Sequence, residues 1–290
     1  MNAVYRRELK ANLFSMTGTI FIVFTLVFIG LYCAMSTFGN MSAHLEYAVY
    51  SASFMSLLAV PVLTMRTFSE ERQTKVDQLL YSLPLTTSEI VLGKFFALAT
   101  IMAVPTAVMC IYPLIMAAFL SAGTINFVLI YASILCYYIL GCAVIAICMF
   151  LSSLTESQVI SAVVSLAAVL LLYFMSSLAQ MVTSSAAVSL VVVLAIAVAV
   201  AYIVWVTVKN YVIAGVVGGV LVLGSVITYV VKSTLFEGLL GKMLSAIAIF
   251  DPITNFVNGI FDISTIIYYV SVIALFVFFT IQCVEKRRWN

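Results

Sequence analysis

The sequence has 290 residues, of which 65% are hydrophobic and 8% are charged, with a formal net charge of +2. Soluble domains contain about 45–50% apolar and about 25% charged residues, and a soluble fold of this length cannot bury so much apolar surface. The composition therefore excludes a soluble globular protein and predicts an all-α integral membrane protein, and the small, scattered charge excludes a nucleic-acid partner.

The first segment, residues 2–15, is predicted to be an N-terminal amphipathic interfacial helix. Its polar side carries three basic residues: Arg6, Arg7 and Lys10. Its apolar side carries three residues at helical spacing: Tyr5, Leu9 and Leu13. Such a helix lies on the inner leaflet with its cations toward anionic headgroups, so the three basic residues are the expected inner-leaflet contacts. Gly18 is a candidate hinge into the first membrane span, and a helical extension of that span is the alternative.

About eight apolar runs are long enough to cross the hydrocarbon core, which requires about 20 residues. They lie at about 17–38, 47–65, 95–121, 125–152, 158–177, 186–207, 211–231 and 264–284. The polar stretch 176–185 is either a loop or a helix kink. In the third span, Pro105 and Pro113 each permit a kink.

An even number of spans places both termini on the same side of the membrane. Alternating the spans places eleven of the thirteen basic residues on that side: Arg6, Arg7, Lys10, Arg66, Arg72, Lys75, Lys94, Lys209, Lys286, Arg287 and Arg288. The positive-inside rule makes this side the cytoplasm. The spans carry no Asp, Glu, Lys or Arg at mid-depth, which argues against a carrier driven by an ion gradient because such carriers need intramembrane carboxylates.

The connection between the second and third spans, residues 64–95, has the densest charge in the chain. Ser69 is the expected N-cap of a helix over 69–83, with Glu70 and Glu71 in its first turn, where the helix dipole favours anions. The apolar side of this helix has five residues at i, i+3 and i+4 spacing: Phe68, Val76, Leu79, Leu80 and Leu83. Pro84 ends it.

The next helix has its own start signal, a capping box of Thr86 and Glu89 closed by the apolar pair Leu85 and Ile90. The connection is longer and more ordered than the spacing of two spans requires, which indicates a docking function. An interfacial loop that only joins two spans is the alternative.

The second long connection, residues 232–263, is predicted to lie on the outer side as an amphipathic hairpin. Two short apolar stripes flank Asp251 and Pro252, which are expected to be the N-cap and the first residue of the second helix. Both helices are too short to span the membrane, so they either line the exit of a pathway or cap the bundle.

The sequence has no motif for catalysis, cofactor binding or metal binding. It has no phosphate-binding loop, and its six cysteines and single histidine, His44, show no metal-ligand spacing. We therefore expect a non-catalytic protein whose energy comes from another chain.

The run FSEERQTKVDQLLYSLPLTTSEIVLGKF resembles the cytoplasmic connection of ABC-2-type transporter permeases. The C-terminal stretch 250–289 is similar to that of the gliding-motility and nitrous-oxide-accessory permeases, a subgroup of the same family. Both resemblances imply one transmembrane permease domain over residues 1–290 in the bacterial cytoplasmic membrane. The hairpin 186–231 departs from the six-span core of the family and is expected to be an addition.

The resemblance also implies that the coupling helix, residues 69–84, docks on a separate nucleotide-binding ATPase that binds ATP and Mg. The expected coupling residues are Glu70, Glu71, Arg72, Lys75, Asp77, Leu79, Leu80 and Pro84. A second permease subunit, identical or different, would complete the transporter.

The favoured hypothesis is thus the permease of an ABC exporter with an unknown substrate. A membrane scaffold that transmits the mechanical work of an ATPase is the first alternative. An ATP-independent secondary carrier is the second, and a membrane enzyme has least support.

Overall fold

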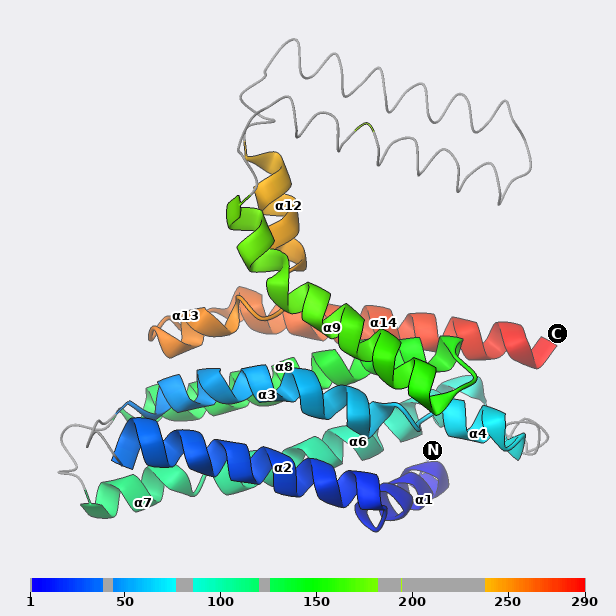
Figure 1. The fold of residues 1–290 in the computed structure, drawn as a ribbon, viewed down its shortest axis with the longest axis horizontal. Helices are drawn as coiled ribbons and strands as arrows, with labels where there is room; N and C mark the ends of the chain where they lie inside the picture. Colours follow the sequence, from blue (N-terminus) through cyan, green and yellow to red (C-terminus); the bar gives the residue numbers. More distant parts are fainter. Residues whose placement is uncertain are drawn as a thin grey trace. The chain divides into compact units, whose positions relative to one another are not determined.

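The computed structural model describes residues 2–38, 44–76, 86–119, 126–181, 194 and 238–289, and Figure 1 shows its fold. The chain divides into two compact units. The first unit comprises Met1–Tyr173 and Ile249–Asn290, and the second comprises Phe174–Ala248. Every regular element within the described ranges is helical.

The helices of the first unit are α1 (Asn2–Leu13), α2 (Met16–Tyr32), the π-helix η1 (Cys33–Phe38), α3 (Leu45–Thr64), α4 (Ser69–Gln73), α6 (Thr87–Met109), α7 (Tyr112–Phe119), α8 (Phe127–Leu154), α13 (Ile253–Val257) and α14 (Ile263–Trp289). Helix α9 (Gln158–Met181) begins in the first unit and ends in the second, which also contains α12 (Leu239–Ile247).

Six candidate membrane spans lie in the described part of the chain, at Met16–Met35, Leu45–Gln73, Thr87–Ala118, Phe127–Leu154, Gln158–Met181 and Ile263–Arg287. Each overlaps one of the predicted spans, so the chain is a multi-pass membrane protein. The predicted spans 186–207 and 211–231 lie outside the described residues except for Leu194, so the total of eight stays a prediction. Residues 176–181 continue α9, which places any break of the polar stretch beyond Met181.

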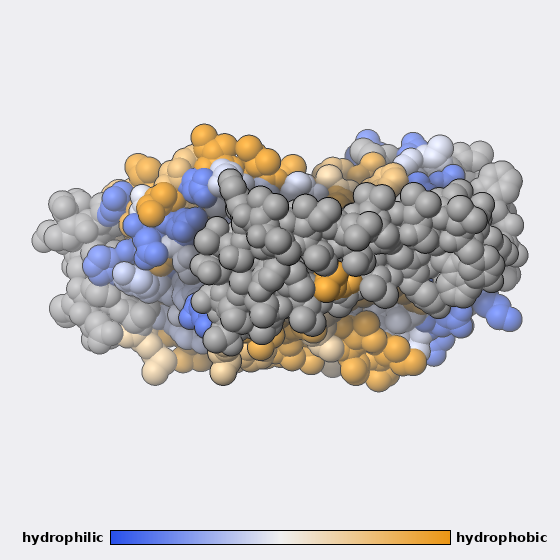
Figure 2. Space-filling view, turned by 90° about the horizontal axis from the view of Figure 1, so that it is seen from above, coloured by the Kyte–Doolittle hydropathy of each residue, from blue (hydrophilic) through white to orange (hydrophobic). Residues whose placement is uncertain are grey.

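Helix α8 is the centre of the first unit. Most of its residues are buried, and it packs most extensively against α14 and α3. Only 17% of the α9 and α14 spans is buried, and both expose large apolar side chains such as Val163 and Phe278. On the face seen in Figure 2, hydrophilic residues gather toward the two ends and hydrophobic residues lie between them. This distribution suits helices surrounded by lipid.

Both termini of the chain lie at the same end of the first unit (Figure 1). Arg287 near the end of α14 donates to the Leu154 carbonyl at 3.2 Å, and Arg72 of α4 donates to the adjacent Thr155 carbonyl at 3.1 Å. Arg7 of α1 in turn forms an ion pair with Glu71 of α4. We call this end the basic end, and it is the end that the charge pattern predicts to be cytoplasmic. Helix α13 packs at the other end of α8.

The predicted helix over 69–83 is interrupted. Helix α4 ends at Gln73, and Lys75 has a positive φ of 57°, a left-handed conformation that a continuous helix does not contain. The predicted N-cap is also wrong, because Phe68 occupies that position and the Ser69 hydroxyl donates back to the Met65 carbonyl. Ser69 is therefore the first residue of α4, one position after the N-cap, and its hydroxyl binds the turn that precedes the helix.

Two other expectations of helix geometry are corrected. The N-cap of α13 is Pro252 and not Asp251, whose backbone carbonyl, not its carboxylate, accepts from Thr254. The apolar side of α1 does not face lipid, because Leu9 and Leu13 pack against the core and α1 lies along α6. The capping box of Thr86 and Glu89 is confirmed at the start of α6.

The turn between α1 and α2 depends on a glycine. Ser15 caps α2 by accepting from the Gly18 amide at 3.1 Å, and the chain end of α1 lies directly over Gly18. A Cβ atom at position 18 would lie 1.9 Å from the Asn12 carbonyl oxygen. The bend into the first span lies at Phe14 and Ser15, and Gly18, predicted as the hinge, is instead the point in α2 where the backbone of α1 approaches it.

We expect Gly18→Ala to lower the free energy of unfolding of the purified chain by at least about 1–3 kcal/mol, because backbone atoms must move to admit the methyl group. Thermal unfolding in detergent measures the change. Gly30→Ala is the matched control, since a Cβ there meets only the Tyr112 hydroxyl at 3.6 Å. Equal midpoints for the two variants would contradict the close approach.

Candidate functional site: a buried ion-pair cluster at the basic end

Lys94 lies on the second turn of α6 with only 1% of its surface exposed. The capping box at Thr86 and Glu89 fixes the start of α6 and so the direction in which this side chain leaves the helix. An isolated ammonium in an apolar interior costs several kcal/mol, so a buried lysine needs partners.

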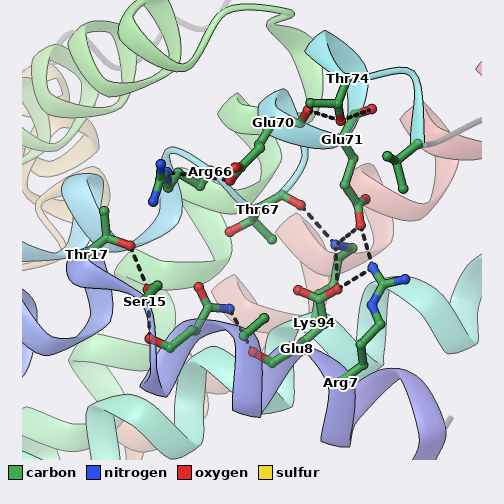
Figure 3. A pocket seen from close by; sticks show the side chains of 13 residues that line it. Arg7, Glu8, Ser15, Thr17, Arg66, Thr67, Glu70, Glu71, Thr74 and Lys94 are labelled. Carbon is green, nitrogen blue, oxygen red and sulfur yellow. Dashed lines mark hydrogen bonds and ion pairs between the residues drawn. The ribbon is translucent and has the colours of Figure 1, made fainter.

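Three acceptors surround the Lys94 ammonium (Figure 3). Nζ lies 3.2 Å from Glu8 Oε1, 2.9 Å from Glu71 Oε1 and 3.0 Å from the Thr67 carbonyl oxygen. Because an ammonium has three N–H donors, these three contacts satisfy it completely. The Phe68 ring, with its centroid 5.3 Å away, adds a cation–π contact.

Arg7 completes the cluster. Its Nη2 lies 2.8 Å from both Glu8 Oε1 and Glu71 Oε1, so two cations and two carboxylates balance in charge. Burial lowers the pKa of Arg7, but its hydrogen bonds and charge interactions with Glu8 and Glu71 outweigh this, and the net pKa is raised. The guanidinium therefore remains charged at any physiological pH.

The cluster joins three parts of the chain that are distant in sequence: α1, the segment from Thr67 through α4, and α6. Gly93, beside Lys94, allows α1 to approach α6 closely, since a Cβ at position 93 would lie 3.1 Å from Val4 Cγ1. Tyr5 adds a hydrogen bond between its hydroxyl and that of Thr100, at 3.0 Å. In the Gly-Lys pair at the start of the third span, Gly93 thus allows close helix packing and Lys94 provides the charge of the cluster.

A second set of contacts joins the same segment to the end of α8, the start of α9 and the connection between them. The Phe68 amide donates to Ser152 Oγ at 3.3 Å, and Arg72 Nη1 donates to the Thr155 carbonyl at 3.1 Å. Arg66 Nε donates to Gln158 Oε1 at 3.4 Å. The segment Arg66–Arg72 therefore contacts four helices of the first unit at the basic end.

The structure divides the predicted coupling residues into two groups. Glu71 and Arg72 point inward to the contacts above, whereas the Glu70 side chain is 44% exposed and Lys75 is exposed. Asp77, Leu79, Leu80 and Pro84 lie outside the described residues, so their role stays a prediction.

The predicted inner-leaflet contacts also divide. Arg6 and Lys10 are exposed on α1. Arg7 instead directs its guanidinium to Glu8 and Glu71, because the two carboxylates offer stronger partners than a solvated headgroup.

Sequence reasoning missed Glu8 and the burial of Lys94. Glu8 is the one acidic residue in an otherwise basic helix, and Lys94 lies directly before the apolar run of the third span. Both are unusual enough to suggest a pair, yet nothing in the sequence shows that α1 folds back along α6.

Among the described residues, no group of three or more His, Cys, Asp or Glu side chains is arranged to hold a metal ion. The ion pairs of the cluster join α1, α4 and α6, so a movement of α4 would strain them.

Residues 9–214 match the sequence model of a family described as ABC-2 family transporter protein. The match covers more than half of the chain and includes Lys94 and every predicted coupling residue. No curated protein matches the chain with significant similarity.

We expect Lys94→Met to destabilise the chain by about 3–5 kcal/mol, because it leaves Glu8 and Glu71 adjacent with only the half-exposed Arg7 to balance them. Glu70→Gln is the control: its ion pair with Arg66 is long, at 3.5 Å, and exposed, so its loss should cost less than about 1 kcal/mol. Unfolding titrations in mixed micelles measure both. Similar costs would show that the cluster is not a structural centre.

Proposed function

We propose that this chain, which belongs to the ABC-2 family of transporter proteins, is the permease subunit of an exporter driven by a separate ATPase. Family membership identifies a membrane permease component of an ABC transporter. Our proposal adds four parts to this. They are export as the direction of transport, a separate ATPase that binds ATP and Mg, a second permease subunit, and a bacterial cytoplasmic membrane with both termini of the chain inside.

The observation that carries the proposal is the connectivity of the segment Arg66–Lys75. Its outward-facing charges, Glu70 and Lys75, can contact a partner in the cytoplasm. Its inward-facing residues, Glu71 and Arg72, bind the buried cluster and the connection between α8 and α9. A force applied to this segment is therefore transmitted to α1, α6 and α8, because charged contacts with fixed partners hold the segment to them.

The distribution of charge supports an external source of energy. In the described spans, every Asp, Glu, Lys and Arg lies near a helix end, and α2, α8 and α9 have none within their spans. A carrier coupled to an ion gradient would need such groups at mid-depth. Coupling to ATP hydrolysis in a partner does not.

The exposed and buried residues of the segment should differ in effect. We expect a double variant, Glu70→Gln with Lys75→Ala, to reduce co-purification of the proposed partner ATPase, because it removes charges at the docking surface. Glu71→Gln should leave co-purification intact and reduce the stimulation of ATPase activity by the permease, because it weakens the connection to Lys94 and Arg7.

Glu285→Gln, an exposed change on α14 at the same end, is the control for general charge effects. Pull-down and ATPase assays in reconstituted vesicles provide the two readouts. ATP-independent transport, or an ATPase that neither binds the chain nor responds to Glu71→Gln, would reject the proposal. Binding and stimulation without movement of any substrate would favour the mechanical scaffold.

A further inference from the structure

A cavity of about 390 Å³ opens between α1, the beginning of α2 and the segment Arg66–Val76 (Figure 3). Its volume lies within the range of about 300–1,000 Å³ that is typical of small-molecule sites. The ion-pair cluster forms one wall, through Arg7, Glu8, Glu71 and Lys94. The permease function described above assigns nothing to this space.

The Thr67 hydroxyl is the feature that suggests a ligand. Thr67 lines the cavity and is 93% buried, with 7% of its surface exposed. Its backbone carbonyl binds Lys94, but its Oγ1 finds no hydrogen-bond partner among the residues that the structure describes. Buried hydroxyls are normally paired, so an unpaired one on a cavity wall points to a group that binds there.

The cavity wall offers both donors and acceptors. Arg66 makes its contacts with Gln158 and Glu70 through Nε, which leaves its terminal N–H groups as donors in the lining of the same cavity. Glu8 and Glu71 receive their ion pairs through Oε1, which leaves Oε2 of each as an acceptor. A ligand with an anionic and a cationic end would match this wall, and a simple anion would face three carboxylates.

The position of the cavity in the membrane further restricts the class of ligand that can bind there. Ser15 and Thr17 line it, and Ser15 is the N-cap of α2, the first membrane span. The cavity thus lies at the depth where a span emerges from the hydrocarbon, which is the level of the lipid headgroups.

We propose that this cavity binds the headgroup of an amine-bearing phospholipid, such as phosphatidylethanolamine. The phosphate binds Thr67 Oγ1 and the Arg66 guanidinium, and the ammonium binds the carboxylates of Glu8 and Glu71. The lipid thereby occupies the space between α1 and α4. This proposal does not depend on an ATPase, so it can be tested on the chain alone.

The test measures binding of phosphatidylethanolamine to the purified full chain in detergent by native mass spectrometry. Thr67→Val, which removes the hydroxyl but keeps the shape, should weaken binding about tenfold, equivalent to about 1.4 kcal/mol. Arg66→Gln should weaken it at least as much. Thr67→Ser, which keeps the hydroxyl, should bind as the unaltered chain does, which separates loss of the ligand contact from loss of the fold.

Two matched controls lie outside the cavity at the same end of the protein. Thr19→Val and Lys286→Gln remove a hydroxyl and a cation at exposed positions on α2 and α14, and both should leave lipid affinity unchanged. Phosphatidylcholine, whose ammonium has no N–H donor, should bind more weakly than phosphatidylethanolamine.

Three results would overturn the proposal. Equal lipid affinity in Thr67→Val, Arg66→Gln and the two controls would show that the lipid binds elsewhere. Full displacement of the lipid by soluble phosphoethanolamine would identify the site as one for a small phosphate compound. Protection of Thr67→Cys from thiol labelling by the ATPase, but not by phosphatidylethanolamine vesicles, would identify a protein segment as the occupant.

Discussion

The ammonium of Lys94 is buried at the end of a membrane span, and much of the basic end is arranged to satisfy it. Its three donors bind Glu8, Glu71 and the Thr67 carbonyl, which come from different parts of the chain. None of these partners can move away without leaving a buried charge unpaired, which is among the more costly defects that a folded protein can contain. The positions of α1 and α4 relative to α6 follow from this constraint.

The same constraint separates the two surfaces of the segment Arg66–Lys75. Residues that face inward are bound to the cluster or to the connection between α8 and α9, and residues that face outward remain available to a partner. A permease that draws its energy from another protein needs this combination: one surface to receive a force and rigid, charged contacts to distribute it. The cavity lies beside the cluster and between helices that the cluster joins. A lipid headgroup bound there, as we propose, changes the strength of the same contacts.

Much of the fold followed from local patterns. The six spans in the described residues coincide with apolar runs of the predicted length, and the capping box of Thr86 and Glu89 forms as its sequence suggests. Predictions that used a single residue type at a helix start were weaker. Ser69 and Asp251 both belong to favoured N-cap types, yet neither is the N-cap, because each helix begins one position away from the predicted place, after Phe68 and after Pro252.

The sequence by itself determined that the chain is helical, where its described spans lie and which end carries the positive charge. The physical reason is that run length, periodicity and charge placement are local properties of the sequence, and these properties decide how a segment inserts into lipid and which side of the membrane it faces. Only the tertiary structure decided that α1 lies on α6, that Arg7 turns from the membrane surface to Glu8 and Glu71, and that Lys94 is buried. These features depend on contacts between residues far apart in the sequence, such as Glu8 and Lys94, which are 86 positions apart, and no local pattern encodes which distant carboxylate a buried cation will meet.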